Sequence, residues 1–326
     1  MQILKTKKSL MAFAALQIAI FHLWIPVLRA SSLPGQIERF FVTTAYIGVD
    51  LFFFLSAYTL SFSDISSKRK FLNKRFSKIY PVFLLFCVAA LIKGKFTLSG
   101  FLLTAIGLDF LRHGGSSFLW FVPALLIMYL VFPFIKVTLS KFNQAKQFLI
   151  SLLVWAALTF AVEYGLRGLI DISIFLCRVP AILLGVFLSK YEDTWTIKHR
   201  VITGTLLFLP GLILIYQFGY YDRLTVPFEG MFYITALPCI LGLIFLLDLI
   251  WQNHSSRAIE AIGGATLEMY CLQILIGSEL VSTLFRLTHN KILTNLLSLT
   301  ILILCSLALA WGISAARKLI FSKNNS

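Results

Sequence analysis

The chain is poor in charge for its length. Only 13% of its 326 residues are Asp, Glu, Lys or Arg, and acidic residues number just 14. A soluble globular domain carries about a quarter charged residues, so the composition excludes an ordinary soluble protein. Hydrophobic residues make up 59% of the chain, and the mean hydropathy is +0.87. The sequence therefore predicts a membrane protein with several spans.

Several signatures of catalysis are also missing. The sequence has no glycine-rich nucleotide loop, no Gly-x-Ser-x-Gly elbow and no zinc-binding helix. Its five cysteines lie in predicted spans without metal-ligand or disulfide spacing, so we interpret them as packing residues and expect no metal. Because no linker, internal repeat or low-complexity tract is visible, we expect one transmembrane domain over residues 1–320 and a flexible tail over 321–326.

Apolar runs divide the chain into about ten predicted transmembrane helices. The runs without charge are residues 9–28, 118–135, 201–221, 231–247 and 292–316, with shorter ones at 79–92 and 147–162. Runs with one or two charges are residues 40–62, 172–189 and 261–285. Residues 96–108 are too short to span alone and are interpreted as a half-helix or interfacial segment. The predicted fold class is therefore all-α, a polytopic membrane helix bundle.

Positive charge predicts the orientation of the bundle. Roughly two thirds of the Lys and Arg residues fall in alternate segments that include both chain ends, so we expect the N- and C-termini in the cytoplasm. The net charge of +15 is then mainly a topology signal. Because the basic residues are spread over every inner loop, no nucleic-acid partner is expected. The expected location is the cytoplasmic (plasma) membrane, in contact with lipid.

Two titratable residues lie inside apolar runs, where such groups are costly and tend to be functional. His22 follows Leu10 by 12 residues, and Asp50 precedes Phe62 by 12. At the helical rise both lie roughly 18 Å above the inner boundary, on helices that a short outer segment joins. The Asp50 carboxylate can then hold one imidazole nitrogen and leave the other as a base. The alternatives are a structural histidine and a packing or capping acid.

A basic segment, residues 68–78, follows the second predicted span. It carries six cations and is interpreted as a loop. This is more positive charge than orientation needs, and it would suit an anionic cytosolic ligand with phosphates, or lipid headgroups. The alternative is a topology signal with lipid contact alone.

Arg178 lies near the middle of its predicted span, where a lone arginine should face a cavity or an acid. Glu268, Glu163 and Asp171 are all open as its partner, and a structural ion pair is as good an interpretation as a substrate contact. Trp120 opens another apolar run, where an aromatic residue is usually an anchor at the membrane face.

Taken in order, several pieces of the sequence resemble the acyltransferase-3 family of membrane acyltransferases. Each piece is weak alone, but their order and spacing along nearly the whole chain are specific. The pieces are Phe21-His22 and residues 48–56, 75–81, 120–124, 178–185 and 267–273.

The resemblance implies transfer of an acyl group, often acetyl, from acyl-CoA as co-substrate. The acceptor would be a hydroxyl of a cell-surface glycan, a lipid-linked sugar or a small exported molecule. The family has an essential histidine that maps to His22, and a basic motif that maps to Arg75 and its neighbours. The candidate site residues are His22 and Asp50 for catalysis, Lys8, Lys74, Arg75 and Lys78 for acyl-CoA, and Trp120, Arg178 and Glu268 for the acceptor.

The chain departs from the family pattern at two positions. Met11 stands where the family usually has Arg or Lys, and Lys8, one turn earlier, could substitute in part. Gln273 stands where the ninth-helix motif often ends in His. Two other functions stay open: a transporter or flippase that uses the intramembrane His, Asp and Arg as a proton and substrate path, and a catalytically silent relative that senses or binds a partner.

Overall fold

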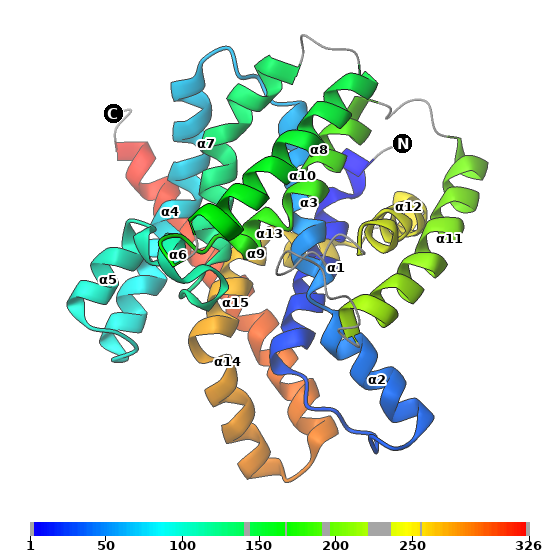
Figure 1. Ribbon diagram of the computed structural model, residues 1–326. Coiled ribbons are helices and arrows are strands. Elements are labelled where there is room, and N and C mark those ends of the chain that lie inside the picture. The colour runs from blue at the N-terminus through cyan, green and yellow to red at the C-terminus, as the bar shows by residue number, and fades with distance from the viewer. Residues whose placement is uncertain are drawn as a thin grey trace. The chain divides into compact units, whose positions relative to one another are not determined.

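The structure, a computed structural model, describes residues 3–139, 144–166, 168–190, 196–220, 236–254 and 256–323. Every element in these ranges is a helix, in agreement with the expected all-α class (Figure 1). Within the described ranges, the helical segments long and apolar enough to cross a membrane are Leu33–Ser61, Lys68–Ile92, Lys146–Gly165, Ile197–Gln217, Thr266–Thr288 and Lys291–Leu319. The chain is thus a multi-pass membrane protein, while the total of about ten spans and the cytoplasmic termini stay predictions.

The helices form two compact units. The first comprises Met1–Leu4 and Val49–Ile250, and the second comprises Lys5–Gly48 and Trp251–Ser326. The first unit holds most of α3 (Ile47–Ser61) and of α12 (Leu237–His254). It also holds α4 (Lys68–Ile92), α5 (Leu98–Ala105), α6 (Leu108–His113), η1 (Gly114–Ser116), α7 (Phe121–Leu139), α8 (Gln144–Phe160), η2 (Ala161–Gly165), α9 (Ser173–Leu176), α10 (Val179–Leu188), α11 (Ile197–Leu214) and η4 (Ile215–Tyr220). The second holds α1 (Ile3–Leu23), α2 (Leu33–Thr44), α13 (Arg257–Gly264), α14 (Thr266–Thr288) and α15 (Lys291–Lys323). Of the expected tail, residues 321–326, the first three residues belong to α15, and residues 324–326 lie outside the described residues.

The basic segment is helical, which corrects its interpretation as a loop. It forms the first half of α4, and the helix continues through Pro81 to Ile92. The Ser67 side chain caps the helix by accepting a hydrogen bond of 3.3 Å from the backbone N–H of Lys70. Lys, Arg and Leu are good helix formers, so residues that signal topology also favour this local structure. The six cations therefore have fixed helical spacing, which a loop would not give them.

The predicted span over residues 172–189 is interrupted in the structure. α9 ends at Leu176, and α10 starts at Val179 with Pro180 in its first turn. Proline lacks a backbone N–H, so Pro180 cannot donate the helical hydrogen bond to the carbonyl of Leu176, which is consistent with the break at this point. Arg178 lies at the junction, as the residue that precedes α10. Interrupted helices in membranes commonly line polar sites.

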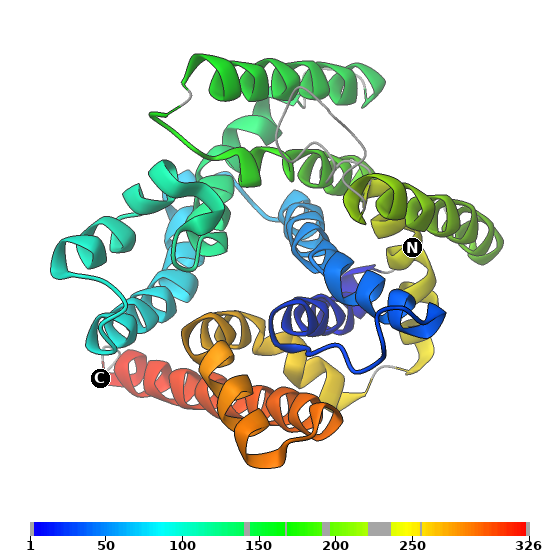
Figure 2. The same ribbon diagram turned by 60° about the horizontal axis from the view of Figure 1, so that its bottom comes forward.

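In the first unit α11 and α12 pack closely side by side (Figure 2). A Cβ atom on Gly211 would lie 2.3 Å from the backbone N of Cys239, and one on Gly242 would lie 2.5 Å from the backbone N of Phe208. Only glycine permits so close an approach of two backbones. A buried ion pair, with Arg200 Nη1 and Asp248 Oδ2 2.5 Å apart, joins the same two helices.

The second unit is built around α1. A Cβ atom on Gly263 would lie 1.9 Å from the backbone oxygen of Lys8, and one on Gly277 would lie 2.6 Å from the Leu23 side chain. α13 therefore contacts α1 near its start, and α14 contacts α1 at its end. Residue numbers rise in the same direction along α1 and along the α13–α14 segment. Between these contacts Ala19 is fully buried. α14 and α15 form an antiparallel pair (Figures 1 and 2).

Candidate functional site

The first unit contains a buried ion pair between Asp50 and Arg178. Asp50 lies in the first turn of α3, where the helix dipole favours a carboxylate, and both side chains are at most 2% exposed. Nε of Arg178 is 4.0 Å from Oδ1 of Asp50, and Nη1 donates a 2.6 Å hydrogen bond to the backbone oxygen of Ile174. The other carboxylate oxygen, Oδ2, has no hydrogen-bond partner among the described residues. The site thus holds a buried acceptor that a ligand donor could satisfy.

The identity of this acid could not be predicted. The sequence leaves Glu268, Glu163 and Asp171 open as partners of Arg178, and the acid that the structure places beside it is Asp50. The reason is the break between α9 and α10, which brings Arg178 opposite the first turn of α3. A proline in an apolar run shows where a helix can break, but not which helix its neighbour will contact.

Trp120 joins this ion pair. Its ring centroid is 5.1 Å from the guanidinium carbon of Arg178, which is a cation–π distance. The preceding residue, Leu119, has a positive φ of 54° and a side chain that is 1% exposed. Such backbone conformations are rare outside glycine and cluster at functional sites. Three predicted site residues, Asp50, Trp120 and Arg178, are therefore in contact, and we call them the arginine cluster.

Four of the six basic residues at the start of α4 fall into two groups. Nη2 of Arg75 donates a 2.8 Å hydrogen bond to Oγ of Ser63, so Arg75 points into the first unit. Lys70, Lys74 and Lys78 are exposed, and their spacing of four residues places them on one helix face. We call these three residues the lysine stripe. The stripe can meet a phosphate-bearing ligand, while Arg75 is anchored beside it.

His22 lies in the second unit, one residue before the end of α1, and its side chain is exposed. Its ring contacts the ring of Phe21 edge-on, with centroids 5.1 Å apart. Neither ring nitrogen has a hydrogen-bond partner among the described residues. Since Asp50 belongs to the first unit, its predicted hydrogen bond to the imidazole stays a prediction.

Two further predicted site residues belong to the second unit. Nζ of Lys8 is 3.9 Å from Oε2 of Glu260, and both side chains are exposed, so this ion pair is weak and can give way to another anion. Glu268 is 8% exposed and lies in the first turn of α14, where the helix dipole favours its charge. The expectation that Glu268 binds the acceptor together with Trp120 and Arg178 stays a prediction.

The sequence analysis missed two polar residues that bind the segment following His22. Glu38 of α2 and Asn295 of α15 bind the backbone of residues 24–28, which leave the end of α1. Their partners lie 10 to 270 positions away in the chain. Neither residue lies inside a charge cluster or a motif, so no sequence signal could have found them.

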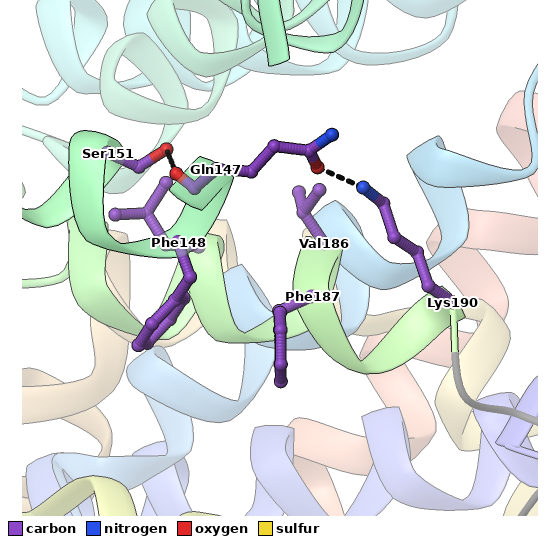
Figure 3. Close-up of a pocket in the computed structure, with 7 residues that line it drawn as sticks. Gln147, Phe148, Ser151, Val186, Phe187 and Lys190 are labelled. Carbon is purple, nitrogen blue, oxygen red and sulfur yellow. Dashed lines mark hydrogen bonds between the residues drawn. The ribbon is translucent and has the colours of Figure 1, made fainter. Parts of the chain in front are cut away.

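A pocket between α8 and α10 in the first unit has none of the predicted site residues in its lining (Figure 3). Lys190 donates a hydrogen bond to the Gln147 side chain across it, and the Ser151 hydroxyl donates to the Gln147 backbone oxygen. Phe148 and Phe187 contribute apolar walls. Partial burial lowers the pKa of Lys190. With its serine donating to the backbone and no histidine or acid in its lining, the pocket is no candidate for acyl transfer.

Two kinds of ligand site can be searched for among the described residues, one for a metal ion and one for an anionic co-substrate. Within them, no three His, Cys, Asp or Glu side chains are grouped closely enough to hold a metal ion. The cations that could hold an anionic co-substrate are Lys74, Lys78 and Lys8, with Arg75 next to the stripe.

Comparison with known proteins gives one finding. A family model described as an acyltransferase domain matches residues 10–315, which include every candidate site residue except Lys8. No curated protein and no solved structure matches the chain. The resemblance drawn from the ordered motifs is thereby confirmed. With the match covering nearly the whole chain and its apolar helices, the chain belongs to the acyltransferase-3 family.

Proposed function

We propose that the protein is an acyltransferase of the cytoplasmic membrane. It transfers an acyl group, acetyl in the first instance, from acyl-CoA to a hydroxyl of a cell-surface glycan, a lipid-linked sugar or a small exported molecule. The observation that carries the proposal is the family match over residues 10–315. Acyl transfer from acyl-CoA needs a site that binds the phosphates of the donor and a base that takes the proton of the acceptor hydroxyl. The chain has residues suited to both tasks.

Lys74 and Lys78 of the lysine stripe, together with their neighbour Arg75, are the proposed donor site. Like charges four residues apart destabilise a helix by about 0.2–0.5 kcal/mol per pair, so the repulsion among Lys70, Lys74 and Lys78 offsets part of the helix propensity that lysine gives α4. The phosphates of CoA would remove this repulsion and form charge-assisted hydrogen bonds. Lys8 is proposed to assist from α1, since its ion pair with Glu260 is long and exposed.

His22 is the proposed general base. A neutral imidazole without hydrogen-bonded nitrogens can accept the proton of the acceptor hydroxyl. The hydroxyl oxygen forms a bond to the thioester carbonyl carbon, the carbon–sulfur bond breaks, and the CoA thiolate takes the proton from the imidazolium. Asp50 keeps its proposed role of orienting the imidazole. Its Oδ2 atom has no partner among the described residues, which leaves it available for a hydrogen bond.

Trp120, Arg178 and Glu268 are the proposed contacts of the acceptor. The ring of Trp120 and the guanidinium of Arg178 offer an aromatic face beside fixed N–H donors, which suits a hydroxylated molecule. Glu268 adds a buried carboxylate that can accept a hydroxyl hydrogen bond.

The test uses purified protein in detergent with labelled acetyl-CoA and an acceptor-containing membrane fraction. Wild type should release CoA and label the acceptor, and His22→Ala should slow both by at least about 100-fold, because general bases contribute that much or more. His199→Ala is the matched control, since His199 is exposed at the start of α11. A folded His22→Ala protein with the wild-type rate would contradict the proposal. A transporter would release no CoA at all.

A further inference from the structure

The segment that follows the proposed base, residues 24–28, is held by a carboxylate from α2. Glu38 Oε1 accepts a 2.9 Å hydrogen bond from the indole Nε1 of Trp24. Its two oxygens accept hydrogen bonds of 2.9 and 3.0 Å from the backbone N–H of Val27. Oε2 also accepts one of 2.8 Å from the backbone N–H of Leu28. We call residues 24–28 the exit segment.

A second group from α15 holds the same exit segment from another direction. Asn295 accepts a 2.9 Å hydrogen bond from the backbone N–H of Ile25 and donates one of 2.8 Å to the backbone oxygen of Ile25. Nζ of Lys291 donates a 3.1 Å hydrogen bond to the backbone oxygen of Pro26. Asn295 is 1% exposed, so this contact is buried and well ordered by packing.

These contacts satisfy every backbone donor of the exit segment. Trp24 donates to the backbone oxygen of Ile20 at 3.0 Å, which closes the last turn of α1, and Pro26 has no N–H. The three remaining donors all go to Glu38 or Asn295. A connecting segment normally leaves several of its donors to water. Complete satisfaction by side chains from two other helices indicates that this connection must be rigid.

We infer that Glu38 and Asn295 are positioning residues that fix the orientation of His22 by holding the exit segment. The inference rests on the proposed role of His22 as a base. Helix ends fray unless their final groups are bound, and His22 is the penultimate residue of α1. Its imidazole has no hydrogen bond of its own among the described residues, so its direction depends on the backbone at the helix end. The hydrogen bonds at Ile25 are only three residues from it.

Two substitutions test this inference. Glu38→Gln keeps the size of the side chain but replaces one acceptor oxygen with an NH₂ group that faces backbone donors. Asn295→Asp keeps the acceptor but loses the donor to Ile25. Each should lower kcat for acetyl transfer at least about tenfold, because displacements of about 1 Å can cost still more. The KM for acetyl-CoA should stay within about twofold of wild type, because the donor contacts are unchanged.

A second measurement does not depend on activity. Hydrogen exchange of the amides of residues 24–28 should accelerate in Glu38→Gln and stay unchanged in Gln36→Ala, a matched control at an exposed position of the same helix. If Glu38→Gln does not fold, Asn295→Asp takes its place in both measurements.

The outcomes separate this inference from the proposed function. Faster exchange with unchanged kcat, in a protein where His22→Ala is inactive, would overturn the positioning role and leave the acyltransferase intact. Unchanged exchange in both variants would show that the contacts do not hold the segment. Equal rates for His22→Ala and wild type would instead refute the proposed base, whatever the exit segment does.

Discussion

The buried ion pair shows how single residues in this protein depend on one another. Asp50 and Arg178 are each at most 2% exposed, yet their charged atoms are 4.0 Å apart. At that distance in a poorly solvated interior, the attraction offsets only part of the desolvation cost. The ion pair therefore contributes little net free energy to folding. Removing one partner should destabilise the protein more than removing both, because it leaves a buried charge uncompensated.

This dependence can be measured. Arg178→Met should lower the free energy of unfolding by about 3 kcal/mol, because it leaves the Asp50 charge buried without its cation. Adding Asp50→Asn should restore at least half of that loss. The double-mutant cycle is measured by thermal or chemical unfolding of the detergent-solubilised wild type, both single variants and the double variant. Tryptophan fluorescence monitors the unfolding. Additive losses in the double variant would show that the two charges do not interact.

Among the elements, α4 contains both a basic segment and an apolar segment in one continuous helix, whereas the sequence predicts two separate elements. From the sequence, residues 68–78 predict a basic loop and residues 79–92 a short span, whereas one helix covers both. Helical continuity gives the lysine stripe its regular spacing and points Arg75 toward Ser63 instead of outward. Composition predicts the charge of this region correctly, but the contact of Arg75 with Ser63 depends on where the helix begins.

The stripe predicts a specific kinetic change. Lys74→Gln with Lys78→Gln should raise the KM for acetyl-CoA at least about tenfold, since a hydrogen bond to a charged group contributes about 1.5–3 kcal/mol. kcat should change little, because neither lysine touches the reacting atoms in this proposal. Lys198→Gln, at an exposed position on α11, is the control. A lower kcat with unchanged KM would place the stripe outside the donor site.

At the scale of the whole molecule, the sequence predicts the class of fold and much less of the contacts. Apolar runs locate most of the spans because a membrane allows few other structures. The same runs do not show that the helix breaks at Arg178, or that Asn295 binds Ile25 across 270 positions. Such contacts depend on which faces of distant helices meet. An apolar period of 3.6 residues shows which face of a helix is buried, but it does not show which other helix packs against that face.

Labelling of introduced cysteines can measure the orientation of the molecule in the membrane. The distribution of Lys and Arg predicts that residues 29–32 lie outside and residues 64–67 inside. Ser31→Cys should therefore react with a membrane-impermeant maleimide on intact cells, and Ser66→Cys only after the membrane is permeabilised. Both serines are exposed, and the unmodified chain is the control for its native cysteines. The reverse labelling pattern would invert the orientation and place the lysine stripe on the wrong side for cytosolic CoA.

The backbone at Leu119 has a consequence for how this protein can change. A leucine with a φ of 54° stores about 1–2 kcal/mol of conformational energy that glycine would not. The next residue is the tryptophan whose ring faces the guanidinium of Arg178. Glycine at this position would relieve that strain, but it would also remove a side chain that is 1% exposed, at a cost of about 2–5 kcal/mol. The packing of Leu119 therefore outweighs the strain of the turn that sets the indole beside its cation.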